Sequence, residues 1–312
     1  MARRRGKGRD VNGILLLDKP AGMTSNGALQ QVKRLYKAAK AGHTGSLDPL
    51  ATGVLPLCFG EATKFSQFLL DADKRYSTTI TLGVSTTTGD ADGEVVKEET
   101  PGTYSENEIE AVLERFRGEI DQTPSMYSAV KVNGKPLYKL ARQGIEIERK
   151  SRRVRIYSLS LKSREGDRLA LDITCSKGTY IRSLAEDIGD ALGCGGHISA
   201  LRRLGSGPFD VEDTHTLEEL ESLAESEGLE ALDRQLLPAS AAVQDWPAVE
   251  LTELMSSWVR QGQPVQIPHA PTEGWVRIFL ESDDDDEREF IGVGEILGDG
   301  RVAPRRLVAV SQ

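Results

Sequence analysis

Apolar positions along the chain follow two different periods. Short runs of aliphatic, β-branched and aromatic residues are typical of strands, and apolar residues three and four positions apart are typical of helices. The strand pattern occurs at residues 13–17, 76–83, 127–132, 153–161 and 168–176, and the helix pattern at 26–37, 61–70, 105–117 and 180–192. The strands and helices do not alternate regularly. The pattern therefore predicts an α+β fold with a mixed, largely antiparallel sheet flanked by helices.

The pattern changes after residue 210. Residues 211–245 are acidic and helical in character, and short strand-like runs follow at 275–280, 290–293 and 307–310. We expect a first domain over residues 11–245 and a small β-rich second domain over residues 246–312. The first ten residues hold five basic side chains and are expected to form a flexible arm.

Charge is divided unevenly between these parts. The net charge of −9 is the sum of +6 for residues 1–210 and −15 for residues 211–312. Such asymmetry favours nucleic-acid contact through the basic part. The alternative is that the acidic part only provides a solubilising surface.

Other features exclude several classes of protein. The three cysteines, Cys58, Cys175 and Cys194, have no CxxC spacing, so neither a zinc site nor a disulfide framework is indicated. No signal-peptide core follows the basic N-terminus, and no apolar stretch is long enough to cross a bilayer. We expect a cytoplasmic protein without membrane contact.

A loop rich in glycine and proline, residues 42–53, is the first candidate for chemistry. It holds Asp48 directly before Pro49, and a carboxylate on such a shaped loop could serve as a nucleophile or base. Aspartate in this setting also forms Asx turns, which remains an alternative. The loop lacks the GK[ST] ending of a nucleotide-binding P-loop.

Two further clusters point to RNA. Residues 177–183 place Tyr180 and Arg182 at a predicted strand-to-helix junction, where Arg182 could pair with a carboxylate and Tyr180 could stack on a base. Residues 131–155 carry nine basic side chains against two acidic ones, with tyrosines interleaved. This composition favours nucleic-acid binding, although an exposed arginine or a solvated charged face would give the same pattern.

Six segments together resemble the bacterial tRNA pseudouridine-55 synthase family. They are residues 13–25 (GILLLDKPAGMTS), 42–65, 73–76 (DKRY), 124–144, 176–189 (SKGTYIRSLAEDIG) and 197–204 (HISALRRL). The resemblance spans residues 11–210 in order, and the C-terminal part is similar in outline to a PUA-like RNA-binding domain. It implies that residues 11–245 form a catalytic domain that isomerises one T-loop uridine of tRNA without a cofactor or metal.

The resemblance also assigns roles to individual residues. It implies that Asp48 is the essential carboxylate, which attacks C1′ or acts on the C2′ proton, and that Arg182 pairs with it. Tyr76 is expected to pack against the target ring and to be a candidate for taking the C5 proton. A tyrosine would need activation for that second role, because its ordinary pKa is about 10.

The remaining assignments concern substrate binding and partners. The resemblance implies that Tyr180 and Leu201 line the uracil pocket, that His43 fills the space left by the extruded uridine, and that Lys19 and Pro20 shape the pocket floor. The expected partner is the T-arm of tRNA, bound by a monomer. The alternative function is a tRNA-binding or tRNA-folding protein, in which binding matters more than turnover.

Overall fold

The computed structural model describes residues 8–128, 131–132, 134–141, 143–145, 147–282 and 288–309. Most of the predicted N-terminal arm and several positions within the basic stretch at 131–155 lie outside the described residues, as do the acidic residues 283–287. In the described part of the chain, no helix combines the length and hydropathy that a membrane-spanning segment needs.

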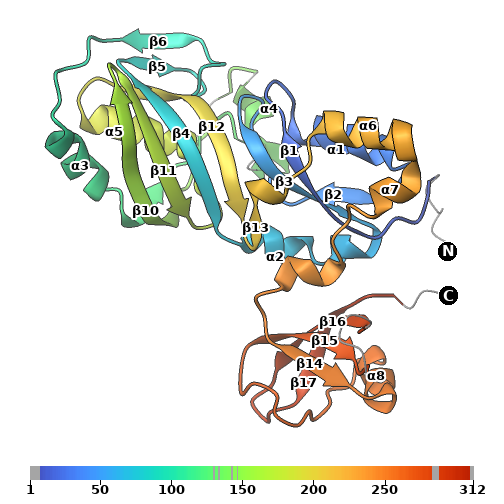
Figure 1. Ribbon diagram of the computed structural model, residues 1–312. Coiled ribbons are helices and arrows are strands. Elements are labelled where there is room, and N and C mark those ends of the chain that lie inside the picture. The colour runs from blue at the N-terminus through green and yellow to red at the C-terminus, as the bar shows by residue number, and fades with distance from the viewer. Residues whose placement is uncertain are drawn as a thin grey trace.

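A large mixed sheet forms the centre of the first domain (Figure 1). Its strands follow the order β1-β3-β12-β4-β11-β10-β7, with β2 paired to β3 and β13 paired to β12. The strands are β1 (Gly13–Lys19), β2 (Ala41–His43), β3 (Thr52–Phe59), β4 (Lys74–Leu82), β7 (Gly118–Gln122), β10 (Arg152–Glu165), β11 (Arg168–Cys175), β12 (Gly196–Ser206) and β13 (Phe209–Asp210). Among the described pairs of this sheet, β12 with β3 is parallel and the others are antiparallel, which confirms the predicted fold class.

Helices bury the apolar faces of the two halves of this sheet. Helices α3 (Glu106–Glu114) and α5 (Ile181–Ala191) pack against β4, β10 and β11, and α1 (Ser25–Leu35) and α6 (Leu217–Glu227) pack against β1 and β3. Strands β12 and β4, which pair with each other near the middle of the sheet, contribute Lys74, Tyr76, Leu201 and Arg203 to the cavity described below. The remaining elements are the helices α2 (Ser66–Asp71), α4 (Leu137–Ala141) and α7 (Leu229–Asp233), the 3₁₀-helices η1 (Gly60–Lys64), η2 (Val211–Asp213) and η3 (Ala239–Val243), and the strands β5 (Val84–Thr86), β6 (Val95–Glu98), β8 (Lys131–Val132) and β9 (Lys135–Pro136).

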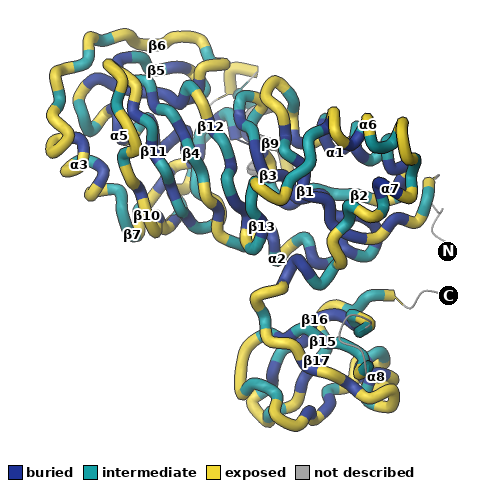
Figure 2. Tube along the Cα trace, viewed as in Figure 1, coloured by how far each residue is buried: buried dark blue, intermediate teal, exposed yellow. Residues whose placement is uncertain are grey.

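A second, four-stranded sheet follows in the order β14-β15-β16-β17. It consists of β14 (Ala248–Leu251), β15 (Trp275–Leu280), β16 (Phe290–Ile296) and β17 (Val302–Leu307), with helix α8 (Glu253–Arg260) beside it. It has its own buried core, and Figure 2 shows this buried interior below the first domain. Phe68 joins the two bodies, with ring centroids 4.9 Å from Trp246 and 5.4 Å from Trp275.

Several predicted elements differ from those observed. The predicted strand at 127–132 is wrong over its first part, because Tyr127 lies in a turn and strand β8 holds only Lys131 and Val132. The predicted helix at 61–70 is divided at Phe65 into η1 and α2. The last predicted strand, at 307–310, lies earlier, at β17, which pairs with β16 and ends at Leu307. Residues 308 and 309 are not in a strand, and residue 310 lies outside the described residues.

Two central strands have no clear sequence pattern. Strand β3 contains Pro56, which has no backbone N–H and usually argues against a strand. The carbonyl of Pro56 still accepts a hydrogen bond from Thr44 N at 3.1 Å. Strand β12 has the sequence GHISALRRLGS, whose two arginines and two serines interrupt any apolar alternation.

Candidate active site

The loop between β2 and β3 is held by hydrogen bonds from two residues, Ser25 and Gly22. Ser25 Oγ accepts a hydrogen bond from Leu47 N at 2.7 Å and donates one to Leu47 O at 3.1 Å. Gly22 N donates to Pro49 O at 2.8 Å. Since these contacts bracket Asp48, they hold its backbone in one position.

Lys19 contacts the same loop, since its Nζ lies 3.5 Å from Pro49 O. Its side chain is fully buried, and Nζ donates to the carbonyls of Pro20 at 2.8 Å and Met23 at 2.6 Å. Burial lowers the pKa of Lys19 to about 8, against the opposing effect of the Asp48 charge. Neither Lys19 nor Pro20 is among the residues that line the cavity described below.

A glycine allows β3 and β12 to approach each other beside this loop. Gly53 pairs in parallel with Arg203 and has a φ of +100°. A Cβ at this position would lie 2.2 Å from the Arg203 carbonyl oxygen. Any other residue would therefore push β12 away from β3.

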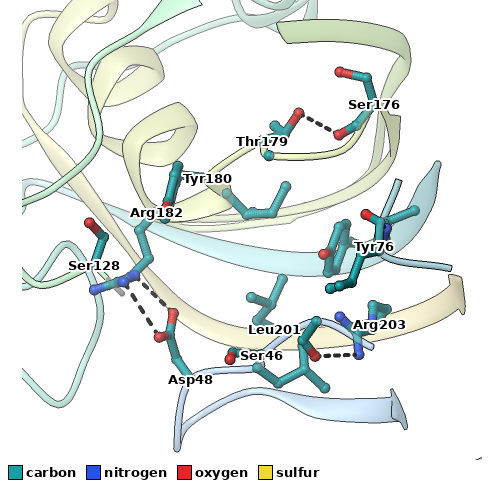
Figure 3. A pocket seen from close by; sticks show the side chains of 16 residues that line it. Ser46, Asp48, Tyr76, Ser128, Ser176, Thr179, Tyr180, Arg182, Leu201 and Arg203 are labelled. Carbon is teal, nitrogen blue, oxygen red and sulfur yellow. Dashed lines mark hydrogen bonds and ion pairs between the residues drawn. The ribbon is translucent and has the colours of Figure 1, made fainter. Parts of the chain in front are cut away.

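A cavity of about 310 Å³ opens between this loop, the start of β4 and the start of α5 (Figure 3). Its lining brings together side chains from distant parts of the chain. They include Ser46, Asp48, Lys74, Tyr76, Ser128, Thr179, Tyr180, Arg182, Leu201 and Arg203.

Asp48 and Arg182 form an ion pair on one wall of the cavity. Arg182 Nε lies 3.0 Å from Asp48 Oδ2, and Nη2 lies 3.4 Å from Oδ1, so the guanidinium faces both carboxylate oxygens. The Arg182 side chain is 6% exposed, whereas the Asp48 side chain is 40% exposed. The arginine is thus buried behind a carboxylate that remains open to the cavity.

The other donors of Arg182 are also engaged. Nη1 donates to Thr88 O at 2.9 Å and lies 3.6 Å from Asp90 Oδ2, and Nη2 donates to Tyr127 O at 3.3 Å. The Asp90 side chain is 6% exposed. These contacts fix the orientation of the guanidinium before any substrate arrives.

Opposing effects act on the Asp48 carboxyl. Burial raises its pKa above the ordinary value, the Arg182 guanidinium pulls the pKa down, and Asp90 adds to the rise. The net direction is upward. Arg182 therefore offsets only part of the cost of holding a carboxylate in this cavity.

Tyr76 and Arg203 lie on the opposite wall. Burial raises the pKa of Tyr76 above its ordinary value, although Arg203 opposes the rise through its charge and a hydrogen bond. Arg203 is 1% exposed, and its Nε donates to Val54 O at 2.6 Å. A neutral phenol ring is thus the favoured form of Tyr76 near neutral pH.

Tyr180 and Leu201 also border the cavity, from the N-terminus of α5 and from β12. His43, in β2, is not among the residues that line it. Burial lowers the pKa of His43, and its Nδ1 has no hydrogen-bond partner among the described residues. The structure thus brings together Asp48, Arg182, Tyr76, Tyr180 and Leu201 and places His43 outside this group.

Sequence reasoning missed Arg203, Lys74 and Asp90. Lys74 is buried and donates to the carbonyls of Leu69 and Leu70 at 3.0 and 2.9 Å, at the end of α2. Lys74 and Arg203 lie within segments 73–76 and 197–204, which carry the family resemblance. No local sequence pattern distinguishes a buried lysine or arginine from an exposed one. Asp90 lies in a polar loop whose composition resembles any turn.

The described residues contain no group of three or more His, Cys, Asp or Glu side chains that could hold a metal ion. The polar groups of the cavity are instead arranged around one ion pair and one aromatic wall.

Comparison with known families gives matches along most of the chain. Residues 33–181 match the TruB family pseudouridylate synthase N-terminal domain. Residues 182–244 match the tRNA pseudouridylate synthase B C-terminal domain, and residues 247–308 match the C-terminal domain of pseudouridine synthase II TruB.

Individual relatives are similar over nearly their whole length. The chain is 58% identical over 300 residues to tRNA pseudouridine synthase B of Ectopseudomonas mendocina, covering 96% of each chain. It is 55% identical over 314 residues to tRNA pseudouridine synthase B of Tolumonas auensis, covering 99% of this chain and 95% of the relative.

Solved structures show the same arrangement. A chain in the structure of an H/ACA RNP bound to a substrate RNA containing 2′-deoxyuridine matches with a TM-score of 0.72 and 26% identity, covering 96% of this chain and 85% of that one. A chain of a Cbf5-Nop10-Gar1 complex matches with a TM-score of 0.70 and 29% identity, covering 96% and 84%.

Proposed function

The chain belongs to the TruB family of pseudouridylate synthases, and from this premise we propose that it converts the T-loop uridine at position 55 of tRNA to pseudouridine. The reaction breaks the N1–C1′ bond and forms a C5–C1′ bond, while C5 loses a proton and N1 gains one. Atoms and electrons balance within the nucleotide, so the isomerisation requires no other reactant. The names of the relatives support tRNA as the substrate.

The observation that carries this function is the Asp48–Arg182 ion pair, whose carboxylate is open to the cavity. We propose Asp48 as the catalytic carboxylate, which attacks C1′ or removes the C2′ proton. Arg182 keeps its oxygens aimed into the cavity. Its charge also stabilises the ionised form that either step needs.

Tyr76, Tyr180 and Leu201 are proposed to hold the extruded uracil. Their side chains come from three different elements and border one cavity, as a flipped base requires. Because burial raises the pKa of Tyr76, stacking is favoured over proton removal by a phenolate. For His43, which lies outside the cavity lining, we propose that its neutral ring fills the gap left in the RNA, in keeping with its lowered pKa.

The two bodies are proposed to divide the work. The cavity lies within residues 11–245, the proposed catalytic domain, and the second sheet within residues 246–312, the proposed PUA-like RNA-binding domain. The chain is further proposed to act as a monomer. Three buried, unpaired cysteines suit the reducing cytoplasm that we propose as its location.

Release of tritium tests this function. The purified protein is incubated with unmodified tRNA that carries tritium at uridine C5, without added cofactor. We expect tritium in the water for the native chain and none for Asp48→Ala, with tRNA binding retained in both. Tight binding without release by the native chain would favour the alternative of a tRNA-binding or tRNA-folding protein.

A further inference from the structure

Arg152 lies at the outer side of the cavity wall, at the start of β10. Its guanidinium carbon is 5.6 Å from the centre of the Tyr180 ring. A Cβ placed on Gly178 would lie 3.7 Å from Arg152 Nη1. Tyr180 and Gly178 both line the cavity, so Arg152 lies directly beside its lining.

The guanidinium of Arg152 contacts the Tyr180 ring. Among the described residues it makes no ion pair and no side-chain hydrogen bond, so its N–H donors have no acceptor there. The next residue shows the contrast, because Arg153 lies 3.7 Å from Glu119 and 3.6 Å from Asp121. Arg152 is only partly exposed. It is an unneutralised cation beside the cavity in a chain of net charge −9.

The ring contact leaves the guanidinium N–H groups of Arg152 available, because none of them has an acceptor among the described residues. A planar fork of donors matches two oxygens of a phosphate group. An aromatic ring within about 6 Å attracts a guanidinium, so the contact with Tyr180 favours this position of the side chain.

We propose that Arg152 binds a backbone phosphate of the RNA directly beside the target uridine. The inference rests on the proposed function, because it requires a nucleotide in the cavity next to Tyr180. A uracil held against Tyr180 has its flanking phosphates within one nucleotide of that ring. The Arg152 guanidinium is already in contact with the same ring.

The salt dependence of binding separates this site from a purely structural contact. The affinity for a T-arm stem-loop is measured over a range of salt concentrations for the native chain and for Arg152→Gln and Arg152→Lys. Loss of one phosphate contact lowers the slope of log affinity against log salt by about 0.7–0.9. We expect this loss for Arg152→Gln and a native slope for Arg152→Lys, which keeps the charge.

Lys162 supplies the matched control. It lies on the same strand, outside the basic stretch at 131–155, and it does not line the cavity. Its Nζ already faces a carboxylate, Asp172 Oδ2, at 3.4 Å. Lys162→Gln removes the same charge and should leave the slope unchanged. Equal losses for the two variants would mean a general charge effect and would overturn the local site.

Neutral phosphates locate the contact. Stem-loops are prepared with one methylphosphonate on the 5′ or the 3′ side of the target uridine. The affinity penalty of Arg152→Gln should vanish for one of the two. An affinity penalty of Arg152→Gln that persists with both modified stem-loops would overturn the proposal. An unchanged salt slope together with a lower kcat would also overturn it, because Arg152 would then act by orienting Tyr180. Tritium release by the native chain is scored separately, so failure of this site does not count against the proposed function.

Discussion

Arg182 meets four acceptors, and together they use every part of its guanidinium group. Nε and Nη2 face the two carboxylate oxygens of Asp48. Nη1 donates to Thr88 O and lies near Asp90, and Nη2 also donates to Tyr127 O. A lysine has one compact charged group and cannot reach these acceptors at once. The geometry, more than the charge, fixes the position of Asp48.

Arg182→Lys tests this directly. We expect kcat/KM for tritium release to fall by about 10²–10³-fold, the loss typical when an oriented donor is removed from a reacting centre. The melting temperature should change little because the charge remains beside Asp48 and Asp90. An unchanged rate would remove Arg182 from the site.

Glu186 makes stability depend on pH. It follows Arg182 by one helical turn, and burial raises its pKa from 4.5 to about 7, with Asp187, Asp190 and Asp90 adding to the rise and Arg182 opposing it. Between about pH 4.5 and 7 the folded chain therefore binds more protons than the unfolded chain. Its free energy of unfolding falls as pH rises through this window.

Glu186→Gln should remove that contribution. Denaturant midpoints are compared at pH 5 and pH 8 for the native chain and the variant. We expect a smaller loss of stability at pH 8 in the variant. Identical pH dependence in the two proteins would contradict an elevated pKa for Glu186.

At the scale of elements, the loop around Asp48 depends on the first turn of α1. Ser25 makes both hydrogen bonds to Leu47 and is 3% exposed. Ser25→Ala leaves a buried backbone N–H and C=O without partners, which costs about 1–3 kcal/mol. We expect a fall in the free energy of unfolding of this size, measured in denaturant, and a lower kcat.

Ser105→Ala is the control for Ser25→Ala. Ser105 caps α3 through the box with Glu108, far along the chain from the loop. It should cost about 1 kcal/mol of stability with kcat unchanged. A native kcat in Ser25→Ala would show that the loop needs no support from α1.

The sequence predicted the elements whose pattern is local. The capping residues Ser105 and Glu108 gave the start of α3, and the alternating run at 275–280 coincides with β15. Strand β12 was not predicted, because its sequence has no regular apolar alternation. It is buried in the sheet because it pairs with β3 on one side and β4 on the other. Arg203 is fully buried there because its donors meet the carbonyls of Val54 and Gly45.

The candidate site shows the same limit. Asp48 and Arg182 are 134 positions apart, and their contact depends on the order of strands in the large sheet. No local pattern contains that order. The residues alone suggested that Arg182 pairs with a carboxylate, and the family resemblance identified that carboxylate as Asp48. The parts played by Asp90 and Lys74 required the structure.

At the scale of the whole molecule, the two bodies are joined by aromatic packing. Phe68 contacts both Trp246 and Trp275, and Phe65 contacts Phe290 at 5.3 Å between ring centroids. Deleting the second sheet would expose these rings to water. A point substitution is therefore a cleaner way to separate the bodies than truncation.

Trp275→Ala should weaken this joint without emptying either core. We expect the native chain to unfold in one calorimetric transition and the variant to show two, because the bodies no longer unfold together. Leu254→Ala, on an exposed position of α8, is the control and should retain one transition. A single transition in Trp275→Ala would show that other contacts couple the bodies.

The central place of β12 also governs how the protein is made. A ribosome delivers β1, β3, β4, β10 and β11 before it reaches residues 196–206, yet β12 is the strand that links β3 to β4. Until then the nascent chain carries unpaired strand edges, which are prone to pairing with other chains. About two-thirds of the polypeptide must therefore be synthesised before the large sheet can be completed. When residues 196–206 emerge, they join the half of the sheet that contains β3 to the half that contains β4.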